Sequence, residues 1–270
     1  MKISKNELKY LRSLSQKKVR QQEKRFLLEG WRALKEALNS DFTIEYVAML
    51  PRFIDDPNYS SIADEIDRRS IEVKELTEAD LNRIADTVHA QGVVALIQQN
   101  SFELSDRGLK QASLILAADG VSDPGNLGSI LRTCDWFGVD LLLLGRGCVE
   151  LYNEKVVRST VGSIFHLAAI EGVDLPNELL HLKKLGFSII ALAGDGRAAY
   201  QQHSFERKTV LVVGSEAHGL SKEIRAVADH VLKIPKFGQA ESLNVGVACG
   251  IVLAHLRAMG NDQCKMKNEK

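Results

Sequence analysis

The sequence predicts an α/β protein made of a small α/β domain followed by a larger α/β domain with a parallel sheet. Three observations point to this class. Between residues 113 and 259, short apolar runs alternate with segments of helical period, as in parallel α/β sheets. One of these runs, 140–144, is apolar in every residue after Asp140, so both of its faces must be covered by helices. A shorter alternation of the same kind over about the first hundred residues predicts the small domain.

The elements of the small domain follow from local patterns. Residues 5–39 are charged with helically spaced apolar positions, and Glu29-Gly30 is the expected interruption. A helix is expected over 62–69, and another begins at Thr77, because Thr77 can cap it and acids fill its first turn. The remaining segments are strands at 44–50, 71–73 and 91–98 and a loop at 51–59. Residues 100–110 are polar and aperiodic, so we interpret them as a linker between domains 1–105 and 106–270.

The second half alternates more regularly. The expected strands are 113–118, 140–144, 165–170, 187–193, 209–213 and 230–234. The expected helices are 126–137, 153–163, 179–185, 221–228 and 242–259. Gly138 and Gly186 follow two of them as terminating glycines. This order predicts a doubly wound sheet with helices on both sides.

Net charge identifies no partner, but its distribution suggests one. Lys+Arg and Asp+Glu both number 35, so the chain is neutral overall. Residues 1–35, however, carry eleven Lys/Arg and only three Asp/Glu. A basic segment of this kind can attract phosphates. An ordinary solvated helix face explains the same composition equally well.

Cysteine and histidine spacings argue against metal and disulfide chemistry. The four cysteines, at 134, 148, 249 and 264, form no C-x-x-C pair and fit no zinc pattern. The seven histidines show no H-x-x-x-H spacing, so no metal is expected. No N-terminal apolar segment or membrane-length apolar run occurs. We therefore expect a cytoplasmic protein with reduced thiols and no membrane partner.

A dinucleotide-like motif at Gly194-Asp195-Gly196-Arg197-Ala198-Ala199 is interpreted as accidental. It follows a strand and matches G-x-G-x-x-A, and Glu216 lies at about the distance of a ribose-binding acid. A dinucleotide loop must open an apolar helix, whose N-terminus holds the pyrophosphate. The polar residues 200–204 follow instead.

Three loops that each lead from a strand into a helix carry the polar residues of interest. They span 119–126, 214–221 and 235–245. Ligands of α/β proteins bind at the carboxyl ends of strands, so the three loops are expected to share one site. Taken singly, each has a simpler explanation: Asn126, Ser221 and Ser242 can be helix caps, and Arg132 a surface residue.

Together the three loops resemble the motifs of the SpoU/TrmH family of RNA ribose 2′-O-methyltransferases, which belongs to the SPOUT class. The motifs read D-x-x-x-D-P-G-N-L-G-S-I-L-R-T, V-x-G-S-E-x-x-G-L-S and I-P-x-x-x-x-x-E-S-L-N-V, and the resemblance covers about residues 112–258. The front half, around F-L-L-E-G-W-R, resembles the L30e-like RNA-binding domain of enzymes that modify large-subunit ribosomal RNA.

The resemblance implies a fold detail, a cofactor and an assembly. Family members form a deep trefoil knot, which strand and helix patterns alone do not predict. Their knot loops bind S-adenosylmethionine, and they are homodimers with the site near the interface. Helices 126–137 and 242–259 are the expected dimer contacts. The residues expected to line the cofactor site are Leu192, Gly194, Gly214, Gly219, Ile234 and Leu243.

The resemblance also implies catalytic roles. Arg132 matches the essential arginine of the first motif. Since the pKa of an arginine is about 12.5 or higher, it is better suited to bind a phosphate and stabilise the developing alkoxide than to act as a base. The proton acceptor is left open. Asn126 and Asn244 are expected to position the ribose, Glu216 to organise the second loop, and Ser242 to hydrogen-bond within the site.

The implied activity is 2′-O-methylation of RNA, with 23S ribosomal RNA as the expected substrate. Alternatives are a non-catalytic RNA-binding or ribosome-assembly protein and a transfer RNA methyltransferase. Two positions depart from the usual motifs: Gly246 where Ser is frequent, and Lys236 where Met is frequent; Lys236 could reach RNA phosphate. Candidate phosphate contacts in the first domain are Lys5, Lys9, Arg12, Lys17, Lys18, Arg20 and Arg25.

Overall fold

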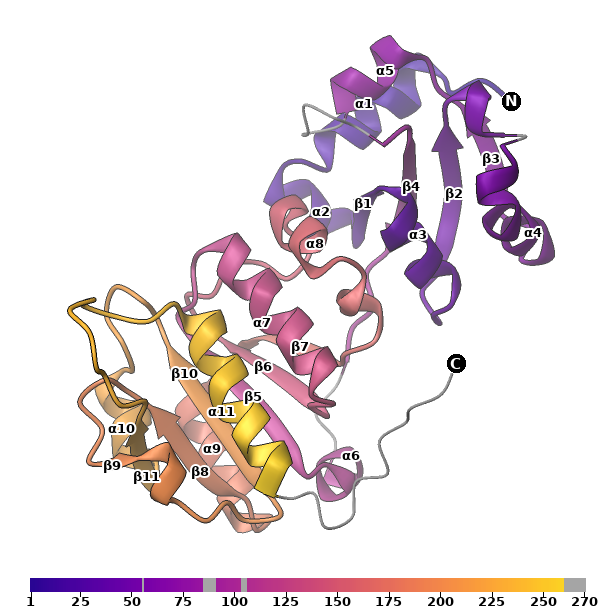
Figure 1. Cartoon of the computed structure of the whole chain (residues 1–270). Coiled ribbons are helices and arrows are strands. Elements are labelled where there is room, and N and C mark those ends of the chain that lie inside the picture. The colour runs from indigo at the N-terminus through magenta and orange to yellow at the C-terminus, as the bar shows by residue number, and fades with distance from the viewer. Residues whose placement is uncertain (55, 85–90, 103–105, 260–270) are drawn as a thin grey trace. The chain divides into compact units, whose positions relative to one another are not determined.

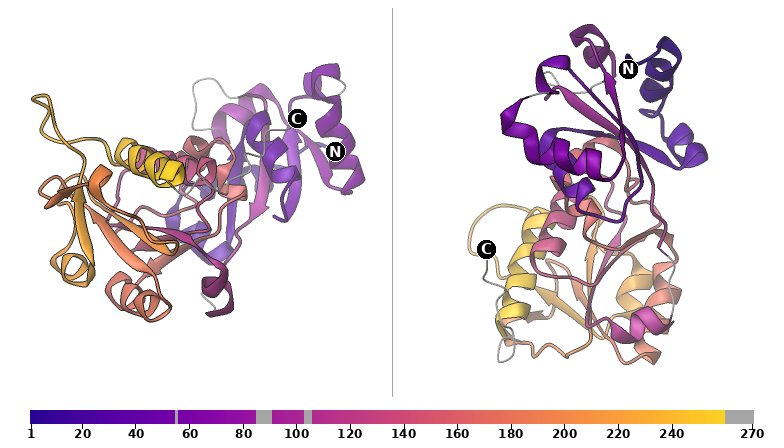
Figure 2. Two further views of the ribbon diagram at one scale, coloured as in Figure 1. Left: turned by 60° about the horizontal axis from the view of Figure 1, so that its bottom comes forward. Right: turned by 90° about the vertical axis from the view of Figure 1, so that its right-hand side faces the viewer.

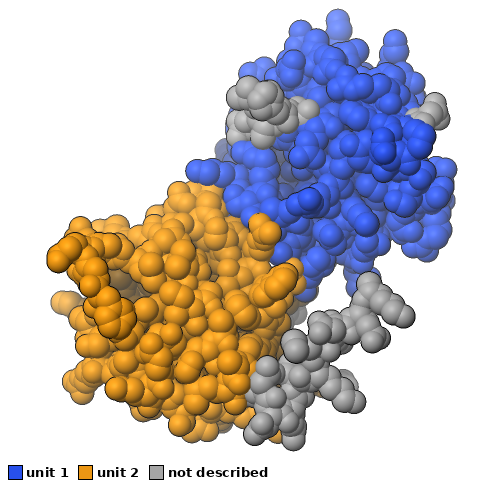
Figure 3. Space-filling model, viewed as in Figure 1, with its two compact units in different colours: residues 1–101, 150–166 blue, residues 102–149, 167–270 orange. Residues whose placement is uncertain are grey.

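The chain folds into two compact units, each described here by itself. The structure, a computed structural model, describes residues 1–54, 56–84, 91–102 and 106–259. The first unit comprises residues Met1–Ser101 together with Glu150–His166, and the second comprises Phe102–Val149 together with Leu167–Lys270 (Figure 3). Contacts thus add 150–166 to the N-terminal unit, and the boundary between 105 and 106 stays a prediction.

The first unit contains a four-stranded mixed sheet. Its strands are β1 (Arg25–Glu29), β2 (Ile44–Met49), β3 (Glu72–Glu75) and β4 (Val93–Gln98), in the order β1-β4-β2-β3. β4 is antiparallel to β1 and β2, whereas β3 is parallel to β2. The helices are α1 (Lys5–Ser13), α2 (Lys17–Glu23), α3 (Trp31–Leu38), α4 (Ser60–Arg68), α5 (Glu78–Ile84) and α8 (Glu154–Thr160). Short 3₁₀ turns occupy Pro51–Phe53, Pro57–Tyr59 and Ser163–Phe165.

The helical expectation for residues 5–39 was wrong in its middle. Lys24 has a φ of 54° and ends α2, and the next residues form β1. Phe26, Leu27 and Leu28 are all buried, because the strand pairs with β4 and both of its faces are covered. Tertiary pairing thus outweighs local helical preference here.

The second unit is built on a seven-stranded parallel sheet (Figure 1). Its strands are β5 (Leu114–Asp119), β6 (Leu141–Gly145), β7 (Ala169–Val173), β8 (Ser188–Leu192), β9 (Ala198–Ala199), β10 (Thr209–Gly214) and β11 (His230–Lys233). They lie in the order β7-β6-β5-β10-β8-β11-β9, and every pair is parallel. The predicted doubly wound parallel sheet is therefore confirmed. The trefoil knot stays a prediction.

Helices cover both faces of this sheet (Figures 1 and 2). α7 (Pro124–Trp136) and α11 (Val245–Met259) pack side by side on one face, and α9 (Leu175–Lys184) and α10 (Lys222–Val227) pack together on the other. A further helix, α6 (Asp106–Gln111), and a 3₁₀ turn at Tyr200–Gln202 complete the unit. Alternate strand residues such as Ile115, Ala117 and Val212 join one core with side chains of α9 and α10. All five residues of β6 are buried, as its uniformly apolar sequence predicts.

Some boundaries differ from the expected ones. Residues 163–165 form a 3₁₀ turn, and β7 begins only at Ala169. α11 begins at Val245 instead of 242, and the expected linker contains α6. The short strand β9 was not expected, because its two residues carry no strand pattern of their own. None of the helices in the described ranges is both long enough and apolar enough to cross a membrane.

The strand order decides where a site can form. β10 lies between β5 and β8, and β8 lies between β10 and β11. The carboxyl ends of these four parallel strands therefore lie along one edge of the sheet. Three of the four loops that leave this edge, after β5, β10 and β11, are those with the polar motifs.

Candidate active site

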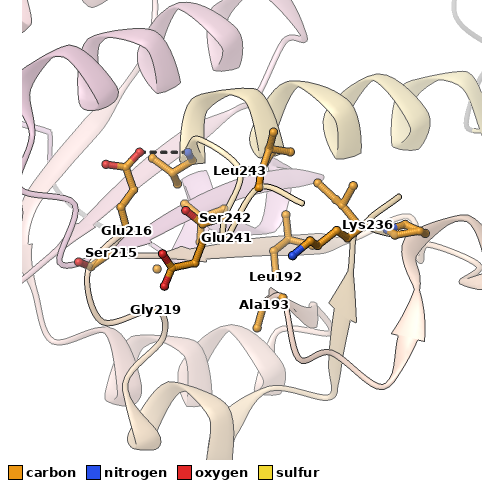
Figure 4. Close-up of a pocket in the computed structure, with 17 residues that line it drawn as sticks. Leu192, Ala193, Ser215, Glu216, Gly219, Lys236, Glu241, Ser242 and Leu243 are labelled. Atoms are coloured by element: carbon orange, nitrogen blue, oxygen red, sulfur yellow. Dashed lines mark hydrogen bonds between the residues drawn. The ribbon is translucent and has the colours of Figure 1, made fainter. Parts of the chain in front are cut away.

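A cavity of about 480 Å³ opens at this edge of the sheet (Figure 4). Its size falls within the range of about 300–1,000 Å³ found for small-molecule sites. It is formed by the segments that follow β8, β10 and β11, together with the start of α11. All six residues expected at the cofactor site line it, namely Leu192, Gly194, Gly214, Gly219, Ile234 and Leu243. Apart from three charged side chains and two serines, the walls are backbone and apolar groups.

Two glycines shape the wall that follows β10. A Cβ atom on Gly214 would lie 2.4 Å from the carbonyl carbon of Gly219, so no side chain fits there. Gly219 has a φ of +65°, and its N–H donates to the Ser215 carbonyl at 2.7 Å, which closes a tight turn. The turn presents main chain to the cavity.

The position of Gly194 has a different consequence. A Cβ atom there would meet nothing within 4 Å, so the missing side chain leaves open space beside the main chain. The accidental dinucleotide motif that starts at Gly194 opens no α-helix; Gly196 instead packs against the backbone of Leu232, and β9 follows. The structure thus agrees with the rejection of a dinucleotide loop.

Asn126, Glu216 and Asn244, one from each of the three motif loops, form a hydrogen-bonded network. The Asn126 Nδ2 donates to Glu216 Oε2 at 2.5 Å, and the Asn244 Nδ2 donates to Glu216 Oε1 at 3.1 Å. The Asn244 Nδ2 also donates to Asn126 Oδ1 at 2.8 Å. Because a carboxylate only accepts, both amides must turn their nitrogens toward Glu216, which fixes their orientation. Residues 126, 216 and 244 are thus brought together within one chain.

Helix capping holds Asn126 in place. The expected cap role of Asn126 was wrong, because Asp123 caps α7 and accepts from the Asn126 N–H at 2.8 Å. Pro124 then occupies the first helical turn, where its missing N–H costs nothing. The Asn126 side chain is therefore free to join the network.

Asn244 has a second function at the start of α11. Its Oδ1 accepts from the backbone N–H groups of Gly246 and Val247 at 3.0 and 3.2 Å. This makes Asn244, and not Ser242, the capping residue of α11. The Val245 N–H donates to Glu216 Oε1 at 3.4 Å, so the start of the helix is tied to the network.

The loop after β10 is also anchored to β5. The Asp119 carboxylate, at the end of β5, accepts from the Ser221 N–H at 2.8 Å. Ser221 itself caps α10, with its hydroxyl accepting from the Ile224 N–H, as its position predicts. Two adjacent strand ends are therefore held together by a carboxylate–backbone bond.

Two predicted catalytic residues lie outside the network. Ser242 is exposed and lines the cavity. Arg132 lies on an exposed face of α7 and is not part of the cavity wall. The structure therefore assembles three of the five predicted catalytic residues directly, places Ser242 beside them, and leaves Arg132 apart.

Sequence reasoning gave no role at this edge to four residues, of which only Lys236 had an expected contact, with RNA phosphate. Asp119 and Asp123 were part of the first motif but had no role, although an acid before Pro-Gly is a recognisable cap signal. Lys236 and Glu241 both line the cavity. Only the folded loop shows that these two charges face a common space.

The predicted phosphate contacts of the first unit differ in exposure. Those that lie exposed on α1 and α2 are Lys5, Lys9, Arg12, Lys17 and Lys18. Arg25 is half-buried and donates to Glu45 at 2.5 Å. Arg20 was a wrong assignment: it is buried, pairs with Glu150 at 2.6 Å, and donates to the carbonyls of Leu14 and Ser15. A guanidinium so engaged cannot bind phosphate.

The chemistry of the site follows from these contacts. Glu216 accepts from three donors, so its carboxylate organises the loops and has little capacity left as a base. The network is open to solvent, so a large substrate can approach it. No cluster of three or more potential metal ligands occurs among the residues that the structure describes.

Comparisons with known proteins agree in both units. Residues 113–254 match the model of the SpoU rRNA Methylase family, and residues 5–95 match that of the MRM3-like substrate binding domain. The chain is similar to the 23S rRNA (guanosine(2553)-2′-O)-methyltransferase RlmP of Bacillus subtilis strain 168. The two are 31% identical over 246 residues, which cover 91% of this chain and 94% of that protein.

Solved structures of RNA methyltransferases are similar to this chain over nearly its whole length. An AdoMet-bound rRNA methyltransferase from Sinorhizobium meliloti has a TM-score of 0.81 at 26% identity, over 96% of each chain. An RNA 2′-O ribose methyltransferase has a TM-score of 0.82 at 27% identity, over 96% of this chain and 99% of that chain.

Proposed function

The chain belongs to the SpoU rRNA methylase family, and on this premise we propose that it methylates a ribose 2′-hydroxyl of 23S ribosomal RNA with S-adenosylmethionine. The observation that carries the proposal is the Asn126–Glu216–Asn244 network beside the cavity. Three loops that are distant in sequence supply one residue each. Structural capping alone would not require their side chains to converge.

The cavity fits S-adenosylmethionine. The open space beside Gly194 and the turn at Gly214 and Gly219 give main chain that an adenosine can approach, and Leu192, Ile234 and Leu243 give apolar contact. When bound, S-adenosylmethionine supplies an electrophilic methyl group on a sulfonium.

The residues of the chain then have to position the ribose and handle its proton. We assign the positioning to Asn126 and Asn244, whose amides are held in one orientation by Glu216. Alignment of nucleophile and electrophile can contribute several kcal/mol to lowering a barrier. Ser242 adds a hydroxyl at the cavity wall. The proton leaves the 2′-hydroxyl as it attacks, and Glu216, already accepting three hydrogen bonds, is not its destination.

Arg132 is assigned to the substrate phosphate and the developing alkoxide. It is exposed on α7 and has no hydrogen-bond acceptor among the described residues, so its guanidinium is available. A guanidinium binds phosphate in a bidentate manner and stays charged at any physiological pH.

We further propose a homodimer that buries the faces of α7 and α11 next to Arg132. Trp136 on α7 is 83% exposed, and Val247 on α11 is 49% exposed. Apolar groups left so open on two adjacent helices are typical of a protein interface. Unit 1 would bind the RNA through the exposed lysines and arginine of α1 and α2.

The test is methyl transfer from labelled S-adenosylmethionine to ribosomal RNA isolated from cells that lack this protein. We expect incorporation into 23S ribosomal RNA and little into transfer RNA. Mapping the 2′-O-methyl groups that disappear from such cells identifies the nucleotide. If no RNA species accepts the label, the chain is a non-catalytic RNA-binding protein. If only transfer RNA accepts it, the substrate assignment is wrong.

A further inference from the structure

Three charged side chains line the cavity: Glu216, Lys236 and Glu241. Glu216 is engaged by Asn126, Asn244 and the Val245 N–H. Lys236 and Glu241 belong to the loop between β11 and α11, and neither bonds to another of the described residues. Figure 4 shows Lys236 extended toward the middle of the cavity and the Glu241 carboxylate lying toward Gly219. The cavity therefore holds one cation and one anion that are unpaired.

The other residues that line the cavity are uncharged. The ends of β8 and β10 contribute Leu192 and Gly214, and the segment after β8 contributes Gly194; these residues suit an uncharged adenosine. The loop with Lys236 and Glu241 is then left for the charged part of a ligand. Lys236 and Glu241 are also five residues apart on one loop without bonding to each other, so both are available to a third group.

The charge balance matches the methyl donor. One positive and two negative side chains give the cavity a net charge of −1. S-adenosylmethionine carries a sulfonium, an α-ammonium and an α-carboxylate, which sum to +1. Its amino-acid end is a zwitterion, and an unpaired cation and anion in one loop are complementary to such a group.

We propose that Lys236 binds the α-carboxylate of the donor and Glu241 binds its α-ammonium. The inference rests on the proposed function and specifies which residues recognise the amino-acid end of its cofactor. A methionine at position 236, frequent in similar motifs, cannot make this contact. Both side chains are exposed, so each contact is worth at most about fivefold in affinity, the upper range for solvent-accessible ion pairs.

Calorimetric binding to the full-length protein without RNA tests the inference. The ligands are S-adenosylhomocysteine, decarboxylated S-adenosylmethionine, which lacks the carboxylate, and methylthioadenosine, which lacks the whole amino-acid end. We expect Lys236→Met to weaken the binding of S-adenosylhomocysteine about fivefold. The affinities for the other two ligands should not change. Glu241→Gln should weaken the binding of S-adenosylhomocysteine and of decarboxylated S-adenosylmethionine by a similar factor. The binding of methylthioadenosine should not change.

Two control variants distinguish the loss of a specific contact from a disruption of the fold. Lys236→Arg keeps the charge and should restore binding, and Lys222→Met, an exposed lysine outside the cavity, should change nothing. Unchanged S-adenosylhomocysteine binding by Lys236→Met, together with weaker RNA binding, would assign Lys236 to RNA phosphate and overturn the inference. Equal weakening of all three ligands would also overturn it. A wild-type protein that binds none of them would refute the proposed function itself.

Discussion

Glu216 connects all three motif loops through its two carboxylate oxygens. Both oxygens accept, from Asn126 on one side and from Asn244 and the Val245 N–H on the other. A glutamine at this position would present an NH₂ group to one of these donors. The consequence concerns geometry more than charge, because whichever asparagine amide faces this NH₂ group would lose the acceptor that orients it.

We predict that Glu216→Gln lowers the single-turnover rate of methyl transfer about 10- to 100-fold, since small misplacements of reacting groups cost rate on this scale. The free energy of unfolding should fall by only about 1 kcal/mol, as for one lost hydrogen bond. Rapid-quench assays and urea unfolding measure the two effects. Glu223→Gln, an exposed acid on α10, is the matched control. A rate within twofold of wild type would contradict the organising role.

Arg132 is not among the residues that line the cavity, so its loss should separate chemistry from cofactor binding. We predict that Arg132→Ala abolishes methyl transfer and leaves the Kd for S-adenosylhomocysteine unchanged. Arg132→Lys keeps the charge without the bidentate geometry and should recover little activity. Transfer assays and calorimetry on the same preparations check this. A parallel loss of both properties would show that Arg132 supports the cofactor site.

For single residues, the sequence predicted which side chains belong to the site better than it predicted their hydrogen-bond and ion-pair partners. Asn126, Glu216 and Asn244 stand out because their motifs are specific. The capping role of Ser221 was predicted correctly, but those of Asn126 and Ser242 were not, since Asp, Asn and Ser at a helix start are equally good caps and only the backbone path selects among them. Arg20 looked like its neighbouring surface cations, but its partner Glu150 is 130 residues away in sequence.

Helix α1 is held to strand β3 by a partly buried ion pair. Lys74 on β3 is buried and donates to Glu7 on α1, which also accepts from the Ser4 N–H in a capping box. The Lys74 ammonium, with help from Ser4, lowers the pKa of Glu7 from 4.5 to about 2. A lowered pKa means that the pair stabilises the fold fully above pH 4.5 and loses this effect as the pH falls toward 2.

We predict that Glu7→Gln costs about 1 kcal/mol of unfolding free energy at pH 7, since Glu7 keeps partial contact with solvent. The difference from wild type should shrink below pH 4.5 and vanish near pH 2. Urea unfolding across this range measures it. Asp41→Asn, an exposed acid in the same unit, should show no such trend. A difference independent of pH would exclude the ion pair as its cause.

Elements with strong local signals were predictable. β6 is uniformly apolar, α10 begins at a serine cap, and glycines follow α7 and α9. β1 was missed because Phe26, Leu27 and Leu28 also suit a helix, and pairing with β4, about 70 residues further on, decides the outcome. β9 is held by two pairs with β11 and has no signature of its own.

For the molecule as a whole, the parallel sheet follows from the alternation of strands and helices. The order in which β10 inserts between β5 and β8 does not, because it depends on long-range pairing. This order is what brings the three motif loops to one edge. The family motifs made the shared site predictable, whereas the two charges at Lys236 and Glu241 became meaningful only once the loop was folded.

If the faces of α7 and α11 form a homodimer, charges placed there should separate the protomers. We predict that Trp136→Glu combined with Val247→Asp yields a monomer by light scattering. Both side chains are exposed, so folding should be unaffected. Leu180→Glu, on the opposite face of the sheet, should leave the mass unchanged. A doubly substituted protein that keeps the wild-type mass would place the interface elsewhere, or show that the wild-type protein is itself monomeric.

RNA affinity should depend on salt through the lysines and arginine of α1 and α2. We predict that Lys9→Ala combined with Arg12→Ala weakens binding to RNA of any sequence. The magnitude of the slope of log K against log salt concentration should fall by about 0.7–0.9 per lost phosphate contact. Filter binding at several salt concentrations measures the slope. Lys222→Ala in the other unit is the control. An unchanged slope would mean that these cations do not touch phosphate.

The first unit is discontinuous in sequence, because Glu150–His166 completes it. A fragment that stops at residue 101 would keep the buried Arg20 guanidinium and discard its carboxylate, a loss that costs about 3–5 kcal/mol for a buried pair. It would also strip the rings of Tyr152 and Phe165 from Phe26. To produce the first unit as an isolated protein, residues 150–166 should therefore be joined to residue 101 through a flexible linker. During synthesis, likewise, the first unit can complete its fold only after the ribosome has added residue 166.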